Sequence, residues 1–491
     1  MNTTTLPATQ RAIQLLGPDQ LALNPAKSVS QPGPYQILGK VEVCGLCFSD
    51  LKLLKQFNGH VRKSEVKTGI DQNALLEIPS YVPGDKPTVP GHEVVVRVVA
   101  VGAKVQKAKV GGRYLVQTDY RWLPTANSAS AFGYNFEGAL QEYVLMDERV
   151  IVAPDGESML IPVPEDLSAS AIALCEPWAC VEDAYVDKQR NKLRDGDMVY
   201  HGSNADDVEK LFAKLPANGL MVICQDGGKF NRPVVVPVGR VHYGAIRIVG
   251  TTGSKVEDAL AAIPATAEIR PNNKINIIGA AGPMGTMHVI RDLCQGVPGV
   301  TVYGGDLSDE RLAMLNKLAG PIAAKNKLTL RTYNPSKDKL TEKFDYIVLM
   351  APVPALVVQS VVDAAPRGII NIFAGIPADK TATLDLDAYI EKQLYFIGTS
   401  GSTLDDLKAV LKKVVSRQLD TNLSVAAVSG LEGAIDGIRA VEKNLMPGKI
   451  LVYPSMKGMK LTPLSDLTGK LPLKDGQWNK QAEEALVGDG T

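Results

Sequence analysis

One glycine-rich stretch, residues 275–290 (INIIGAAGPMGTMHVI), constrains the fold of this chain more than any other. A short apolar run ends at Gly279, and Gly282 and Gly285 follow before an apolar, Met-rich segment. This pattern is typical of a buried parallel strand that turns sharply into a helix. The glycines let the backbone approach a pyrophosphate, which rests on the N–H groups at the start of the helix. The stretch therefore predicts a dinucleotide-binding turn.

A carboxylate further along the chain indicates which dinucleotide is bound. Residues 301–311 (TVYGGDLSDER) place Asp306 about 20 residues after Gly285. A carboxylate there accepts hydrogen bonds from the adenine-ribose diol and repels a 2′-phosphate, so NAD is favoured over NADP. The predicted cofactor-binding residues are Gly279, Gly282, Pro283, Met284, Gly285, Asp306 and Arg311.

Composition narrows the class of protein. A chain of 491 residues holds two or three domains, and 45% hydrophobic with 22% charged residues is typical of a soluble globular protein. The 53 basic and 53 acidic residues balance, which argues against nucleic-acid or membrane-surface partners. We find no signal peptide pattern, and six cysteines in so long a chain favour a reducing compartment, so we expect a cytoplasmic protein.

The sequence pattern along the chain changes at two points. Short β runs with Gly and Pro punctuation begin near Tyr35 and predict a compact β-rich domain. From about Asp197, strands and helices alternate, which indicates a parallel α/β sheet. The segment between Asp50 and His92 is long for a connection, and its basic residues either solvate a helix face or clamp an anionic substrate.

Part of the α/β region is repeated. Residues 250–258 (GTTGSKVED) match residues 398–406 (GTSGSTLDD) at an offset of 148 positions, with weaker matches upstream. The first copy has no phosphate-binding turn, and we expect it to pack beside the main sheet or to extend it. The expected organisation is an N-terminal extension (1–33), a β-rich domain (34–195, with part of the tail), an inserted partial repeat (196–271), an NAD-binding domain (272–454) and a C-terminal tail (455–491).

Three separated pieces of the β-rich region carry metal-binding chemistry. Cys47, His92 with Glu93, and Glu176 together offer a thiolate, an imidazole and carboxylates. Such ligands around Zn²⁺, with one position open, make a catalytic site. The open position would hold a hydroxyl or water whose pKa the metal lowers, and Ser49 could carry the proton away. The other cysteines and histidines are expected to be core or surface residues.

These motifs, in this order, resemble the zinc-dependent medium-chain dehydrogenase/reductase family of the alcohol and sorbitol dehydrogenase kind. The resemblance rests on residues 45–50 (GLCFSD), 91–93 (GHE), 173–177 (ALCEP), 279–285 (GAAGPMG) with Asp306, and 430–452. It implies a GroES-like β-rich catalytic domain and a Rossmann domain that here carries a partial internal duplication. The segment GTSGS is similar to that of the sorbose-1-phosphate reductase group.

The resemblance also implies roles for single residues. Cys47, His92 and Glu176 would be zinc ligands, Glu93 an alternative ligand, and Ser49 the proton relay. Asp50 would orient His92. Many members hold a structural zinc on a lobe with four closely spaced cysteines, but residues 117–134 contain no cysteine, so we expect one catalytic zinc and no structural zinc.

The favoured function is a zinc-dependent, NAD-linked oxidoreductase that interconverts an alcohol, either a polyol or a sugar phosphate, and its ketone or aldehyde. The expected partners are a small-molecule substrate and further copies of the chain in a homo-oligomer. Three alternatives stay open: a zinc-free reductase of the same fold, an NADP-dependent enzyme, and a non-catalytic NAD-binding protein.

Overall fold

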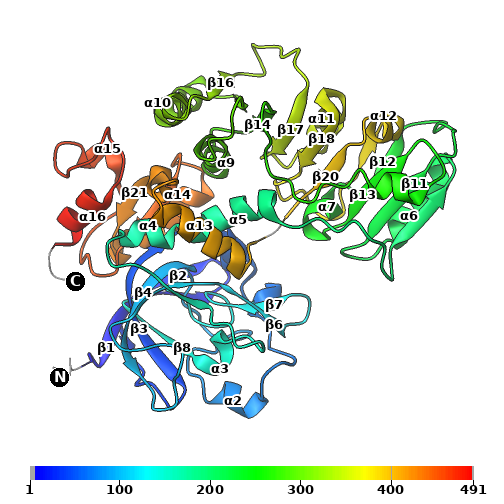
Figure 1. Cartoon of the computed structure of the whole chain (residues 1–491). Helices are drawn as coiled ribbons and strands as arrows, with labels where there is room; N and C mark the ends of the chain where they lie inside the picture. The colour runs from blue at the N-terminus through cyan, green and yellow to red at the C-terminus, as the bar shows by residue number, and fades with distance from the viewer. Residues whose placement is uncertain (1–5, 400, 489–491) are drawn as a thin grey trace. The chain divides into compact units, whose positions relative to one another are not determined.

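The computed structural model describes residues 6–399 and 401–488, which form two compact units (Figure 1). The first unit takes the chain up to Trp178 and again from Thr403 onwards, and the second runs from Ala179 to Ser402. Ser400, in the second copy of the repeated segment, lies outside the described residues. None of the helices in the described part of the chain has the length and apolar character needed to span a membrane.

The first unit is built on a mixed sheet. Its strand order is β23-β21-β22-β3-β4-β5-β9, and β8 also pairs with β3. The bounds are β3 Gln36–Gly45, β4 Glu93–Val101, β5 Arg113–Val116, β8 Tyr143–Asp147, β9 Leu160–Pro162, β21 Val425–Ser429, β22 Lys449–Val452 and β23 Thr462–Pro463. Two hairpins, β1 Thr9–Gly17 with β2 Gln20–Ser28 and β6 Asp119–Pro124 with β7 Ala129–Ala131, complete its strands.

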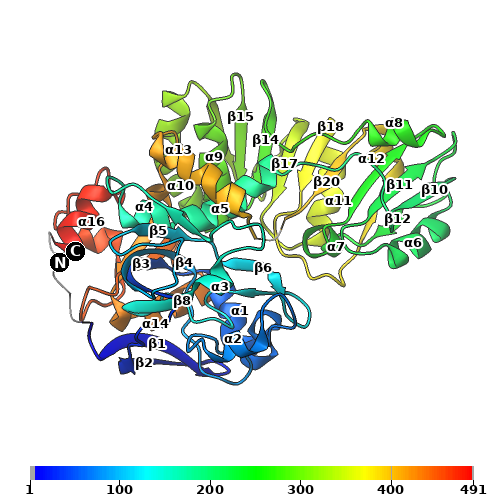
Figure 2. The same ribbon diagram turned by 60° about the horizontal axis from the view of Figure 1, so that its bottom comes forward.

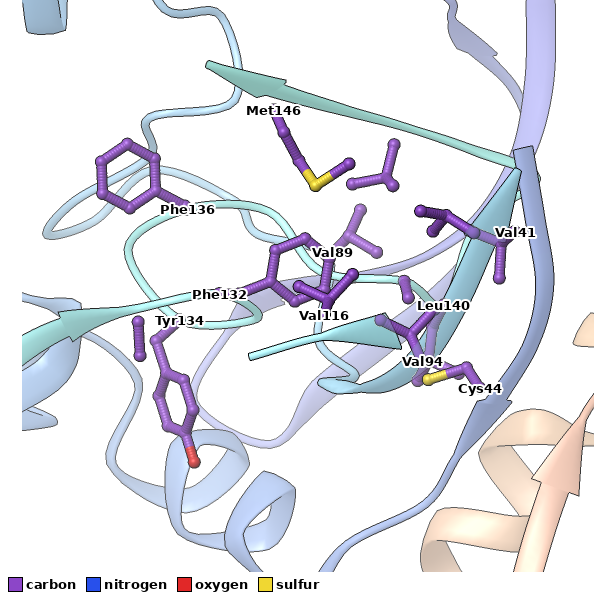
Figure 3. Close-up of a cluster of buried hydrophobic side chains, with 14 of the residues drawn as sticks. Val41, Cys44, Val89, Val94, Val116, Phe132, Tyr134, Phe136, Leu140 and Met146 are labelled. Carbon is purple, nitrogen blue, oxygen red and sulfur yellow. The ribbon is translucent and has the colours of Figure 1, made fainter. Parts of the chain in front are cut away.

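Alternating apolar residues of these strands form the core of the first unit (Figure 3). Val41, Val94 and Val116 point inwards from three neighbouring strands and meet Phe132 and Leu140 from the connecting segments. All five side chains are at most 1% exposed. Period-two alternation puts these residues on one face of the sheet, while Val43, Val95 and Leu115 on the other face are also buried.

The helices of the first unit are mostly short. They are α1 Phe48–Gln56, α2 Gln72–Leu76, α3 Glu148–Ile151, α4 Ala169–Ala173, α13 Leu404–Val415, α14 Leu431–Glu442, α15 Leu464–Leu467 and α16 Lys480–Val487, while α5 Cys175–Val186 runs from the first unit into the second. The C-terminal tail is ordered up to residue 488, and Trp478 is 1% exposed.

The second unit contains the predicted Rossmann sheet. Six strands, all of them parallel, have the order β16-β15-β14-β17-β18-β20, and Figure 2 shows β14, β17 and β18 as neighbours in this sequence. This is the doubly wound 3-2-1-4-5-6 order. The elements are β14 Lys274–Ile278, α9 Pro283–Cys294, β15 Thr301–Gly305, α10 Asp309–Lys325, β16 Thr329–Tyr333, β17 Phe344–Leu349, α11 Pro354–Asp363, β18 Ala364–Asn371, α12 Leu386–Glu391 and β20 Tyr395–Ile397. The expected fold class is confirmed.

The inserted repeat forms its own three-stranded parallel sheet in the order β10-β11-β13. Its elements are β10 Met198–His201, α6 Ala205–Lys214, β11 Leu220–Cys224, β12 Val234–Val236, α7 Gly239–Tyr243, β13 Arg247–Thr251 and α8 Val256–Leu260. The short strand β12 pairs with β19 (Ala382–Leu384) of the main repeat. Both copies share one hydrophobic core, so the insert packs beside the main sheet.

Several expected boundaries differ from the structure. The first unit includes the described residues before 34, and its first part ends at Trp178, not at residue 195. We predicted that the NAD-binding domain continues to residue 454, but β21 and β22 belong to the sheet of the first unit. They pair in parallel, with α14 between them in the chain, so their sequence has the same pattern as a Rossmann strand–helix–strand unit. Pairing between β22 and β3 assigns them to the other sheet.

Candidate functional site

The turn between β3 and α1 brings Cys47, Ser49 and Asp50 together. Cys47 is the N-cap residue of α1, and its backbone N–H donates to Asp50 Oδ2 over 3.1 Å. The Ser49 hydroxyl donates to Cys47 Sγ, also over 3.1 Å. The capping contacts therefore fix the position of the thiol relative to the two polar side chains that follow it.

His92 and Glu93 lie at the start of β4, on the strand that pairs with β3. Gly91 has a φ of +97°, and a Cβ there would lie 2.8 Å from Cys44 Sγ. A Cβ on Gly45 would lie 2.2 Å from Glu93 Oε2. Both glycines are required, because a side chain at either position would push apart the two strands that carry the site.

Cys47, His92 and Glu93 form a compact set of metal-ligating groups. One ligand atom from each lies within 4.8 Å of the others. His92 and Glu93 are 4% and 0% exposed, and Glu93 Oε2 has no hydrogen-bond partner among the described residues. A buried acceptor without a partner is costly, and a cation would satisfy it. The thiol, imidazole and carboxylate are the donor types that zinc takes, so the residues fit this metal.

Two side chains hold the ring of His92. Its Nδ1 is 3.2 Å from Asp50 Oδ1, and its Nε2 is 3.2 Å from Ser49 Oγ. Burial lowers the pKa of His92, but Asp50 and Cys47 raise it more, so the pKa lies well above its usual value. Zinc binds the neutral imidazole, so metal binding would compete with the proton that Asp50 and Cys47 stabilise. The expected contact of Asp50 with His92 is present.

Lys449 is a site residue that sequence reasoning missed. Its Nζ is 2.5 Å from Glu93 Oε1 and 2.7 Å from the carbonyl oxygen of Leu46. Burial lowers the pKa of Lys449, but Glu93 and Cys47 raise it above the usual value. Lys449 therefore compensates the charge of Glu93 and holds one of its two oxygens.

Glu176, on α5, is not one of the three residues whose ligand atoms cluster within 4.8 Å. It is 8% exposed, and burial raises its pKa to about 7. The charge of Glu93 adds to this rise, whereas His92 and Lys449 oppose it. Glu176 is therefore in electrostatic reach of the cluster, and three of the four predicted metal ligands are grouped.

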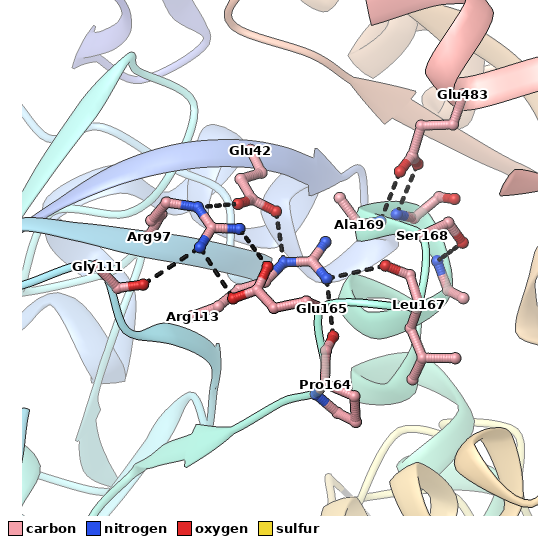
Figure 4. A network of polar contacts seen from close by, with 12 residues as sticks. Glu42, Arg97, Gly111, Arg113, Pro164, Glu165, Leu167, Ser168, Ala169 and Glu483 are labelled. Carbon is pink, nitrogen blue, oxygen red and sulfur yellow. Dashed lines mark hydrogen bonds and ion pairs between the residues drawn. The ribbon is translucent and has the colours of Figure 1, made fainter. Parts of the chain in front are cut away.

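A polar network fixes the segment that leads to Glu176 (Figure 4). Arg113, on β5, bonds Glu42 and donates to the carbonyl oxygens of Pro164 and Leu167 at 3.0 and 2.8 Å. The carboxylate of Glu483 accepts from the first two backbone N–H groups of α4. These bonds tie the start of α4 to the sheet and to the tail, and α5 follows α4 directly.

The predicted cofactor turn lies between β14 and α9 in the second unit. Gly279 has a φ of +89°, and a Cβ on Gly285 would lie 2.2 Å from the carbonyl oxygen of Gly279. Gly282 is the N-cap residue of α9, and Pro283 is the first residue of the helix. Gly279 and Gly285 thus permit a turn and a close approach that a side chain would block, whereas a Cβ on Gly282 would make an ordinary contact of 3.7 Å with the carbonyl oxygen of Gly279.

Asp306 directly follows β15, the neighbour of β14 in the sheet, and is 5% exposed. Its Oδ1 accepts from Arg311 Nη2 over 2.7 Å and from the backbone N–H of Ser308 over 3.0 Å. The carboxyl end of this strand is where an adenine ribose lies in a Rossmann fold. Asp306 and Arg311 are therefore paired with each other at the expected place.

Comparisons with known proteins agree with this geometry. The model of the alcohol dehydrogenase GroES-like domain matches residues 33–155. L-sorbose 1-phosphate reductase of Klebsiella pneumoniae is 23% identical over 92% of this chain and 91% of its own length. The uncharacterized protein YggP of Escherichia coli is 28% identical over 45% of this chain, and this match spans 57% of the length of that relative.

Solved structures share the fold. The structure of 2R,3R-butanediol dehydrogenase from Bacillus subtilis covers 91% of this chain and 100% of its own, with a TM-score of 0.58 and 18% identity. A zinc-binding dehydrogenase from Sinorhizobium meliloti, bound to NADP, has the same coverage with a TM-score of 0.56 and 17% identity. The GroES-like domain match and the sorbose 1-phosphate reductase match support a medium-chain dehydrogenase/reductase family for this chain, and the solved structures show the same fold.

The pair of Lys449 and Glu93 gives a stability prediction. Lys449→Met leaves the Glu93 carboxylate buried without its counter-charge and should lower the unfolding free energy of the metal-free protein by about 3–5 kcal/mol. Adding Glu93→Gln should restore most of this loss. Urea unfolding followed by tryptophan fluorescence measures it, because all three tryptophans lie in the first unit.

The exposed Lys443, from the same segment, is the matched control, and Lys443→Met should change stability little. If the losses from Lys449→Met and Glu93→Gln simply add, the two side chains are not coupled and the assigned role of Lys449 is wrong.

Proposed function

We propose that this chain is a zinc-dependent, NAD-linked dehydrogenase that interconverts an alcohol and its ketone or aldehyde. The observation that carries this is the compact grouping of the half-buried Cys47 with the buried His92 and Glu93. Cys47 and His92 would hold the zinc, with Glu93 or Glu176 supplying a carboxylate. Zinc in such a site acts as a Lewis acid on the substrate oxygen, and the nicotinamide ring exchanges a hydride with the neighbouring carbon.

The chain's own side chains would handle the proton. Ser49 Oγ contacts both Cys47 Sγ and His92 Nε2, so it is adjacent to any hydroxyl held between these two groups. Tyr134 also hydrogen-bonds Ser49. Ser49 would accept the hydroxyl proton of an alcohol while it gives its own hydroxyl proton to water, to which this partly exposed residue has access. Asp50, in contact with Nδ1 of His92, fixes the ring so that Nε2 faces Cys47.

Metal analysis with one substitution tests this function. The purified chain should hold about one zinc ion, in keeping with a three-ligand catalytic site. Cys47→Ser should lose the zinc, and alcohol-dependent reduction of NAD should fall by roughly a hundredfold or more. Cys294→Ser, at the end of α9, is the matched control and should leave both quantities unchanged.

Two other outcomes of these measurements would favour one of the alternative functions. Activity without bound zinc, insensitive to Cys47→Ser, selects the zinc-free reductase. Dinucleotide binding without turnover of any alcohol or ketone selects the non-catalytic NAD-binding protein.

The preference for NAD rests on Asp306. A titration should give tighter binding of NADH than of NADPH, because the carboxylate accepts from a ribose diol and repels a 2′-phosphate. Asp306→Ser should weaken NADH binding by roughly tenfold, about the value of one charge-assisted hydrogen bond, and narrow the gap to NADPH. Asp309→Ser is the control, since Asp309 is exposed and pairs with Lys337. Tighter binding of NADPH by the unchanged protein would select the NADP-dependent alternative.

The basic segment between Asp50 and His92 bears on the substrate. Lys55 bonds Asp19 and Glu442, and Lys63 is fully buried, where it donates to backbone carbonyl oxygens. These partners argue against a substrate clamp for both lysines, and the buried Lys63 does not solvate a helix face either. Arg62 differs from these two lysines, because the ring of Tyr134 connects it to the metal-ligating cluster.

Three aromatic contacts connect Arg62 to the cluster. Its guanidinium lies 5.5 Å from the ring centroid of Tyr134, and that ring is 6.0 Å from the ring of His92. The ring of His60 is 5.1 Å from that of Tyr134. Burial, and after it the charges of Arg62 and Lys52, lower the pKa of His60 to about 4. Arg62 is also paired with Asp119. We infer an anionic substrate such as a sugar phosphate, as the name of the Klebsiella relative suggests.

A pair of substrates isolates the role of Arg62. Arg62→Gln should lower kcat/KM for L-sorbose 1-phosphate by roughly 10- to 100-fold, the value of one charge-assisted contact, and leave the smaller kcat/KM for L-sorbose unchanged. Lys55→Gln is the control and should change neither value. An equal fall for both substrates would mean that Arg62 only supports the fold around Tyr134.

The remaining expectations stay predictions. The balanced charge and the small-molecule chemistry of the relatives favour a small substrate over a nucleic acid or a membrane. The cytoplasmic location and the homo-oligomer have no direct test in the structure.

A further inference from the structure

The inserted repeat copies the second half of the Rossmann unit element by element. Residues 198–224 correspond to residues 149 positions later, and residues 234–251 to residues 148 positions later. By this rule β10, α6, β11, β12, α7 and β13 correspond to β17, α11, β18, β19, α12 and β20. Strand register is conserved as well: Met221 pairs with Ile248, and the equivalent residues Ile370 and Phe396 pair in the main sheet.

The two copies meet through equivalent surfaces. In the antiparallel pair of β12 and β19, Val234 is opposite Leu384 and Val236 is opposite Ala382. Val234 is equivalent to Ala382 and Val236 to Leu384, so exchanging the copies reproduces the same pairing. The central pair, Val235 with Thr383, consists of two equivalent positions. A local twofold axis therefore passes through this pair.

Contacts away from these strands obey the same symmetry. A Cβ on Gly250 would lie 2.6 Å from Ile390, and a Cβ on Gly398 would lie 2.9 Å from the backbone of His242. Gly250 is equivalent to Gly398, and His242 is equivalent to Ile390. Likewise β13 contacts α12 while β20 contacts α7. Each contact thus has a counterpart in which the two copies exchange roles.

Reciprocal pairing of one patch with its own equivalent defines an isologous interface, the kind formed by two identical chains around a twofold axis. Here the interface is well packed, since Val234, Val236, Leu384 and Ile390 are at most 2% exposed. Strands β13 and β20 also lie against each other, although they belong to separate sheets (Figure 1).

We propose that the insert takes, within one chain, the place of a second copy of this chain at the β20 edge of the Rossmann sheet. The edge is thereby closed, and a homo-oligomer must be built through another surface. An exposed sheet edge is a template for association with another chain, so covering it also removes a site of unwanted pairing.

The insert begins and ends at neighbouring points, because the backbone N–H of Gln189 donates to the carbonyl oxygen of Ala265 over 2.9 Å. Residues 190–264 can therefore be replaced by a short Gly-Ser linker without stretching the chain. This shortened chain exposes β19, α12 and β20, and it should form a dimer of twice the mass in sedimentation. Across the twofold axis residue 383 would face its own equivalent in the partner.

Engineered cysteines locate the axis. Thr383→Cys in the shortened chain should form a disulfide-linked dimer under mild oxidation. Leu384→Cys should not, because the two cysteines would be offset by two residues along antiparallel strands and their Cα atoms would lie roughly 8 Å apart, beyond the reach of a disulfide. In the full chain Thr383→Cys should give no linked dimer, since Val235 occupies the facing position, and Val235→Cys with Thr383→Cys should close a bond within one chain.

A folded but monomeric shortened chain, or a cross-link at 384 in place of 383, would overturn the proposal. A disulfide-linked dimer of the full chain carrying Thr383→Cys alone would also overturn the proposal. This test stays decisive even if circular dichroism shows that the shortened chain is unfolded. If the full chain carrying Thr383→Cys forms no disulfide-linked dimer, the result supports the proposal that the insert closes the β20 edge.

Discussion

The buried carboxylate of Glu93 is the constraint on which the first unit depends. A charge that is 0% exposed requires a partner in a fixed position, and Lys449 supplies it. Lys449 begins β22, and β22 pairs with the end of β3, next to the turn that carries Cys47. The metal-ligating residues of one part of the chain are therefore held in place by a strand that follows them by more than 350 positions. That requirement explains why residues 403–454 belong with the β-rich unit.

Local patterns were enough to predict the cofactor turn and most of the parallel sheet. The turn at Gly279 requires a positive φ, which glycine adopts without strain. The next strand in the chain is β15, and its carboxyl end leads to Asp306. The assignment of β21 and β22 failed for the opposite reason. Their strand–helix–strand pattern is compatible with either sheet, and only the long-range pairing with β3 decides between them. A single sequence contains no signal for that choice.

The candidate site shows the same division. Cys47, His92 and Glu93 lie in short motifs and were identified from them. Lys449 lies within the motif 430–452 but was given no role there, and Arg62 lies in a segment without a motif. One signal was available for Lys449: a lysine at the head of an apolar strand (KILV) needs a counter-charge if it is buried. For Arg62 no pattern separates it from its neighbour Lys63, which the structure buries against backbone carbonyl oxygens. Which of these two adjacent basic residues lies beside the ring of Tyr134 depends on the fold of the segment.

The internal repeat adds a constraint of another kind. Its offset changes from 149 to 148 between β11 and β12, so one copy has an extra residue in the connection between these strands. A change there is tolerated, because loops accept insertions. Within β12 a shift of one residue would turn Val234 and Val236 away from the shared core and move Val235 off the twofold axis. The constant offset through β12, α7 and β13 is therefore what an interface between equivalent surfaces requires, whereas a repeat that merely fills space would have no need to preserve it.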